Sequence, residues 1–126
     1  MCAALLFATL AVYAQVARHE FVLYDDPDYV TTNEHVRAGL TWDGVAWAFT
    51  SSQAGNWFPL TWISHMADCQ IFGVDSGMLH LMNVFYHALA ALLVFAVFRR
   101  MTGAVWRSAF VAFLFALHPL HTESVA

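Results

Sequence analysis

Two polar motifs beside hydrophobic segments carry the residue types that acid–base catalysis needs. Asp25 and Asp26 follow the first apolar run, in the sequence Tyr-Asp-Asp-Pro-Asp-Tyr. His118, His121 and Glu123 follow the third apolar run, in the sequence His-Pro-Leu-His-Thr-Glu. Carboxyl groups held close together raise one another's pKa, which suits a general base. One predicted membrane crossing precedes the first motif and three precede the second, so we expect both motifs to face the same compartment and to form an active site there.

Each motif also has a simpler interpretation. Asp-Pro-Asp is ordinary turn chemistry, and on the residues alone a solvated turn is the favoured interpretation of the acidic motif. Pro27 drives Asp26 out of the α region, so we expect the two adjacent carboxylates to point in different directions. The histidine motif lacks an HExxH or comparable ligand set. We therefore assign no metal ligands, although a divalent metal stays open.

The composition indicates a membrane protein. Of the 126 residues, 60% are hydrophobic and only 11% are charged, whereas a soluble domain carries about 25% charged residues. The chain has no Lys and no basic patch of useful size, which excludes a nucleic-acid partner. Cys2 and Cys69 lie far apart and form no CxxC pair, so they predict neither a disulfide framework nor a metal site.

Three hydrophobic segments predict an all-α membrane protein, since about 20 apolar residues are needed to cross a bilayer. The predicted parts are a transmembrane helix at about 1–17, an extracytoplasmic loop at 18–77, a transmembrane helix at 78–98, a cytoplasmic loop at 99–106, a transmembrane helix at about 107–120 and the start of a second extracytoplasmic loop at 121–126. The first segment is short, and a cleaved signal peptide is its alternative. Against that alternative, no Lys or Arg precedes the apolar run.

The orientation follows from an uneven charge distribution. Arg99, Arg100 and Arg107 cluster between the second and third segments with no acid near them, and short Arg-rich loops stay cytoplasmic. Eight acidic residues and only two Arg lie between residues 18 and 79. This distribution predicts that the long loop and both polar motifs are extracytoplasmic.

Three polar residues lie on one face of the second segment. His80, Asn83 and His87 fall within an arc of about 60° at helical spacing. Polar groups at membrane depth face the protein interior, because lipid cannot satisfy them. We expect this face, together with His118 and His121, to bind the substrate or donor. A haem or metal protein using His80 and His87 is a rival interpretation, but their i,i+7 spacing is wrong for two axial ligands of one haem.

The long loop is rich in tryptophan and predicts two ordered amphipathic helices. Thr41 can cap the first helix, and Pro59 suits the first turn of the second. Their apolar faces are formed by Trp42, Val45 and Phe49 on the first helix and by Trp62, Met66 and Cys69 on the second. Such helices beside a membrane are expected to lie in the interface plane. The simpler interpretation is that the aromatic residues serve as anchors and packing.

Four segments together resemble a known family. In chain order they are Phe21–Val30, Trp57–Met66, His80–Val84 with His87, and His118–Ala126. The chain resembles the N-terminal part of the membrane protein O-mannosyltransferases that carry transmembrane and tetratricopeptide repeats, in the bacterial branch. The resemblance covers nearly the whole chain, and its HPxHTExVA signature is more specific than the Asp-Asp pair.

The resemblance implies a GT-C-type multi-helix transmembrane domain and a glycosyltransferase. Such enzymes take a sugar, typically mannose, from a polyprenyl phosphate and place it on Ser or Thr hydroxyls of a protein acceptor with inversion. By resemblance, Asp25 and Asp26 correspond to the acidic pair of the first loop, and Glu123 with His121 to the motif of the second loop. One departure is Phe58, where many relatives have His.

The resemblance also implies a location and a missing part. We expect an integral protein of the bacterial inner membrane, in contact with membrane lipids, with the active site on the extracytoplasmic side. The chain has no helical repeat of about 34 residues, so it looks like an N-terminal fragment that is inactive alone. A non-catalytic membrane scaffold of the same family is the alternative function.

Overall fold

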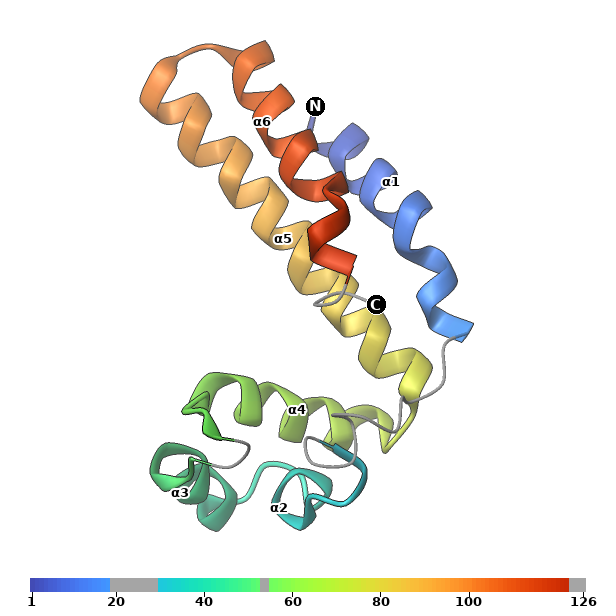
Figure 1. Cartoon of the computed structure of the whole chain (residues 1–126), viewed down its shortest axis with the longest axis vertical. Coiled ribbons are helices and arrows are strands. Elements are labelled where there is room, and N and C mark those ends of the chain that lie inside the picture. The colour runs from blue at the N-terminus through green and yellow to red at the C-terminus, as the bar shows by residue number, and fades with distance from the viewer. Residues whose placement is uncertain (19–29, 53–54, 123–126) are drawn as a thin grey trace. The chain divides into compact units, whose positions relative to one another are not determined.

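The structure is a computed structural model that describes residues 1–18, 30–52 and 55–122 (Figure 1). Within these ranges every regular element is a helix and no strand forms. The chain divides into a first unit, residues 1–19 and 80–126, and a second unit, residues 20–79. This all-helical structure agrees with the predicted fold class at the level of secondary structure.

The first unit contains three apolar helices. They are α1 (Cys2–Tyr13), which continues as the 3-10 helix η1 (Ala14–Arg18), most of α5 (Ser76–Thr102), and α6 (Val105–Leu117), which is followed by the 3-10 turn η4 (Pro119–His121). Among the described residues, α5 alone has both the length and the hydropathy to cross a membrane: it has 27 residues and includes an 18-residue stretch with a mean hydropathy of 2.1. The other two are apolar but shorter.

Two helix boundaries differ from the predicted ones. Helix α5 runs to Thr102 and α6 begins at Val105, so most of the predicted cytoplasmic loop 99–106 is helical. Arg is a good helix former and is favourable near a helix C-terminus. Gly103 makes the turn with a φ of 67°, a conformation that only glycine adopts without strain. Helix α6 ends at Leu117 because the residue before Pro119 is disfavoured in the α region.

Small side chains let the helices of the first unit approach one another. The buried residues of α6 are Ser108, Ala109, Ala112 and Ala116. Two buried clusters join the helices: Leu5, Phe95, Ala109 and Ala112 form one, and Tyr13, Val16 and Val84 form the other. Each cluster combines residues of the N-terminal segment with residues of α5, and Figure 1 shows α6 beside α1. Close helix packing through small residues is the usual arrangement in membrane proteins.

The second unit consists of α2 (Glu34–Arg37), α3 (Trp42–Thr50) and α4 (Pro59–Phe72) with the first residues of α5. The predicted start signals are confirmed. The Thr41 hydroxyl accepts the backbone N–H of Gly44 at 3.0 Å, and Pro59 occupies the first turn of α4. The core consists of Val30, Val36, Ala48, Trp62, Met66, Cys69 and Leu79.

Of the two predicted apolar faces of the second unit, the one on α4 is buried and the one on α3 is exposed. The stripe on α4 is apolar as predicted, but it packs into the core of the second unit, with Trp62 and Met66 both 0% exposed, so it is not free to lie in a membrane interface. Helix α3 instead turns Gly44 and Ala48 inward. Its predicted face is on the outside, where Trp42 is 90% exposed and Phe49 is 50% exposed. Helix α3 is therefore apolar on two sides. Gly44, Ala48 and Trp47, whose ring is 5.3 Å from that of Trp62, face α4, whereas Trp42 and Phe49 stay exposed.

Candidate functional site

The three residues predicted to be catalytic lie outside the described residues. Asp25 and Asp26 fall in residues 19–29, and Glu123 falls in residues 123–126. Their roles stay predictions. The described part of the site is the histidine motif up to Thr122 and the helix faces beside it.

The histidine motif forms a tight turn at the end of α6. His118 is extended, with φ −70° and ψ 128°, and its ring Nδ1 accepts the backbone N–H of Leu120 at 3.2 Å. The backbone N–H of His121 donates to the His118 carbonyl at 3.0 Å. Since Nδ1 is an acceptor in this arrangement, the ring proton of neutral His118 is on Nε2. His118 is exposed, so this N–H can serve as a hydrogen-bond donor to a ligand.

His87 of α5 lies against this turn. Its Nε2 is 2.9 Å from the carbonyl oxygen of Ala116, and the residue is only 8% exposed. The His87 ring stacks on Phe115 with centroids 5.4 Å apart, and it is 5.2 Å from the ring of His121. The structure thus joins two sequence motifs that were predicted separately.

An aromatic residue from α1 completes the cluster. The Tyr13 ring meets the His87 ring edge-on, with centroids 5.5 Å apart. Tyr13 is 4% exposed. Sequence reasoning missed this residue because an aromatic side chain at the end of an apolar run is equally typical of a membrane-interface anchor.

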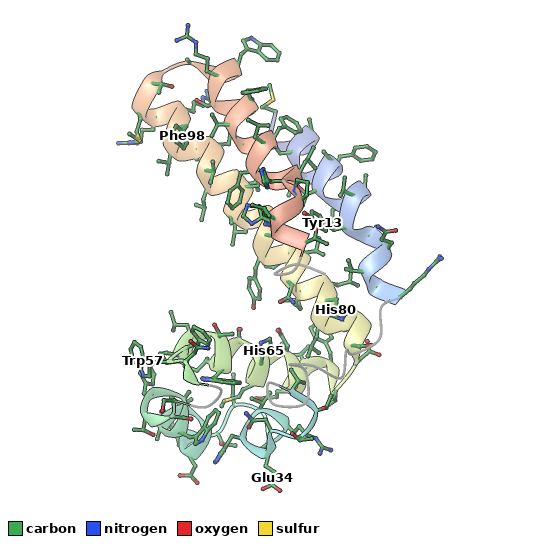
Figure 2. The ribbon with its side chains drawn as sticks, in the orientation of Figure 1. Tyr13, Glu34, Trp57, His65, His80 and Phe98 are labelled. Atoms are coloured by element: carbon green, nitrogen blue, oxygen red, sulfur yellow. The ribbon has the colours of Figure 1, made fainter. Side chains whose placement is uncertain are left out.

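The other two polar residues of α5 lie earlier on the same helix. His80 and Asn83 are half-buried, and Figure 2 marks His80 near the start of α5. No set of three or more His, Cys, Asp or Glu side chains within the described ranges is arranged to hold a metal ion. The role of His80 and Asn83 in binding a donor stays a prediction.

Two small cavities flank the histidine turn. One has a volume of about 230 Å³ and is lined by Phe110, Phe113, Leu114, Leu117, His118 and Pro119. The other has a volume of about 270 Å³ and is lined by Val12, Tyr13, Gln15, Val16, Leu117, Pro119 and Thr122. The walls of both are mainly apolar, and the first cavity suits an apolar group held next to the imidazole of His118.

The second unit holds a buried carboxyl group that sequence reasoning did not single out. Asp68 of α4 is 4% exposed, and burial raises the pKa of its carboxyl group above the ordinary value. The pKa of the neighbouring Cys69 thiol is raised by burial and by the charge of Asp68, while Arg37 lowers it. Asp68 is off the apolar stripe of α4, so no pattern in the sequence predicted its burial.

Comparison with known proteins gives the relatives of this chain. Protein O-mannosyl-transferase Tmtc2 of Drosophila melanogaster is 34% identical over 112 residues, which is 82% of this chain and 12% of that protein. Protein O-mannosyl-transferase TMTC1 of Mus musculus is 32% identical over 128 residues, 94% of this chain and 14% of that protein. Protein O-mannosyl-transferase TMTC2 of Homo sapiens is 27% identical over 124 residues, 93% of this chain and 15% of that protein.

The chain is homologous to a segment of protein O-mannosyl-transferases. This supports the predicted resemblance at the level of the family. The chain spans only 12 to 15% of the length of these O-mannosyl-transferases, which are animal proteins. The bacterial branch and the GT-C fold stay predictions. No family model and no solved structure matches the chain.

Proposed function

We propose that this chain is part of the membrane domain of a protein O-mannosyl-transferase of the GT-C type. The enzyme transfers mannose from a polyprenyl phosphate to Ser or Thr hydroxyls of a protein, with inversion at the sugar carbon. The observation that carries this proposal is the similarity to O-mannosyl-transferases over 82 to 94% of the chain. The long apolar helix α5 supports a membrane location.

The proposed reaction is a direct displacement at the anomeric carbon. The acceptor hydroxyl oxygen forms a bond to this carbon while the bond to the phosphate oxygen breaks. Asp25 or Asp26 takes the hydroxyl proton as a general base, and polyprenyl phosphate leaves. A general base acts here because an alcohol is a weak nucleophile until its proton is removed.

The histidine turn is proposed to bind the leaving phosphate. Hydrogen-bond donors aimed at developing negative charge stabilise a transition state. The exposed Nε2–H of His118 is a donor of this kind, and His121 lies beside it, with ring centroids 6.2 Å apart. The apolar cavities next to the turn suit the first part of a polyprenyl chain. The proposed steps use side chains alone, and transfer measured with and without EDTA tests the alternative of a divalent metal.

Transfer of labelled mannose from polyprenyl phosphate to a Ser/Thr peptide by the full-length protein tests the proposal. We expect Asp25→Asn or Asp26→Asn to lower kcat by a factor of about 10² to 10⁴, because an amide cannot accept the proton. Glu123→Gln should also impair transfer. Asp43→Asn is the matched control, since Asp43 is an exposed acid of the same predicted loop and should leave kcat unchanged.

Two outcomes would contradict the proposal. Near wild-type kcat in both Asp variants would remove the general-base role. No transfer by the wild-type protein from any polyprenyl-linked sugar would instead favour the alternative function, a non-catalytic membrane scaffold.

A further inference from the structure

The last carbonyl groups of α6 do not receive hydrogen bonds from the backbone N–H groups that follow them. In a continuing helix, the N–H groups of residues 119–121 would bond the carbonyls of residues 115–117. Pro119 has no N–H group. The N–H of Leu120 goes to the ring of His118, and the N–H of His121 goes to the His118 carbonyl. The last carbonyls of α6 therefore need donors from elsewhere, and an unpaired carbonyl in apolar surroundings is costly.

His87 supplies one such donor from a different helix. Its Nε2 lies 2.9 Å from the Ala116 carbonyl oxygen. A carbonyl oxygen only accepts, so the imidazole must donate its Nε2–H in this bond. The ring is held from several sides, by Tyr13 of α1 and by Phe115 and His121. With 8% of its surface exposed, His87 has little freedom to turn away from this bond.

We propose that His87 is a positioning residue for the histidine motif. By donating its Nε2–H to the Ala116 carbonyl, it fixes the end of α6 and thereby the place of His118 and His121. Its consequence for sugar transfer rests on the proposed function, but the bond itself does not. His87 is not assigned contact with the donor, because its only ring N–H is used by the backbone in the neutral form.

The proposal distinguishes between substitutions of similar size. The amide N–H of Gln reaches about as far from the backbone as Nε2 of His, so His87→Gln can keep the bond to Ala116. His87→Asn places its amide nearer the backbone, where Nδ1 of His lies, and His87→Leu has no donor. Phe85→Leu is the control for altering an aromatic side chain of α5, because Phe85 is 55% exposed.

The experiment uses the full-length protein in lipid nanodiscs with ¹⁵N-labelled histidine. In the wild type, NMR should show His87 as the Nε2–H form and His118 with an unprotonated Nδ1. His87→Leu and His87→Asn should shift the ring signals of His118 and His121, and should lower kcat on the order of 10²-fold with a smaller change in KM. His87→Gln and Phe85→Leu should keep the wild-type signals of His118 and His121 and most of kcat.

The outcomes separate this inference from the proposed function. His87 protonated on Nδ1 alone in the wild type, or unchanged His118 and His121 signals in folded His87→Leu, would overturn the positioning role. Equal loss in His87→Gln and His87→Leu would also overturn it. If His87→Leu does not fold, the positioning role is still tested by the protonated ring nitrogen of His87 in the wild type and by the His118 and His121 signals of His87→Gln. The proposed function and the positioning role can also fail separately. If the wild type transfers no sugar but the His118 and His121 signals shift in His87→Leu, the positioning role is supported and the proposed function is not.

Discussion

The indole N–H of Trp57 donates to the backbone carbonyl of Phe49 at 2.9 Å. This bond ties the segment before α4 to the last turn of α3. Both side chains stay largely exposed, at 62% and 50%. The bond thus supports an apolar surface at α3 that the second unit does not cover. We call it the outer surface of α3; it consists of Leu40, Trp42, Val45, Phe49 and Trp57.

The outer surface of α3 should lie in the membrane interface. The chain continues from the second unit into α5, which can cross a membrane, and Trp is enriched at interfaces. We expect Trp42 fluorescence to be quenched by brominated lipids in a variant of this chain that retains Trp42 as its single Trp. A variant that retains only Trp62, which is 0% exposed, is the control and should be quenched much less. Absence of quenching at Trp42 for every bromine depth would contradict this placement.

Gly44 is required by the contact between α3 and α4. A Cβ atom at this position would lie 2.9 Å from Oγ1 of Thr41 and 3.2 Å from Sδ of Met66. Gly44→Ala should therefore disturb the helix cap and overpack the core at a cost of about 1–3 kcal/mol. Ala is favoured over Gly within a helix by about 1 kcal/mol, so the net fall in the free energy of unfolding should be up to about 2 kcal/mol. Chemical denaturation followed by fluorescence measures this. The exposed Ala46→Ser on the same helix should change it by less than about 0.5 kcal/mol. Equal stabilities of the two variants would show that the contact can relax.

Asp68 should make stability depend on pH. Burial raises its pKa above the ordinary value of 3.8, so the folded state binds the proton more tightly than the unfolded state. The free energy of unfolding should then fall as pH rises from the unfolded pKa through the folded pKa, and stay level above it. Asp68→Asn should remove this fall and be more stable than the wild type at neutral pH.

Denaturation of this chain in detergent at a series of pH values measures the effect of Asp68. The exposed Asp43→Asn is the control and should keep the wild-type pH dependence in this window. An unchanged profile in Asp68→Asn would mean that another group carries the dependence.

The predicted topology can be tested at two exposed positions. In a background without Cys2 and Cys69, Cys introduced at Asp43 should react with an impermeant reagent in intact cells, because its loop is predicted to be extracytoplasmic. Cys introduced at Met101, which is 74% exposed beside Arg99 and Arg100, should react only after the cells are opened. The reverse labelling pattern would overturn the orientation.

Local chemistry was predictable from the sequence alone. The caps at Thr41 and Pro59 depend on residues within one helical turn, so their type and spacing were sufficient. The inward face of α5 at His87 was predictable for a related reason, because helical periodicity and the cost of exposing polar groups to lipid decide it. The break at Pro119 follows from its missing N–H and its effect on the residue before it.

Only the tertiary structure decided which partner each face meets. Periodicity placed Trp42, Val45 and Phe49 on one side of α3, but the small residues Gly44 and Ala48 form the buried side because they allow closer contact. The bond from His87 to Ala116 joins residues 29 apart, and no local rule predicts it. The burial of Asp68 has the same origin. A sequence pattern tells which residues share a face, whereas packing between distant segments determines what covers it.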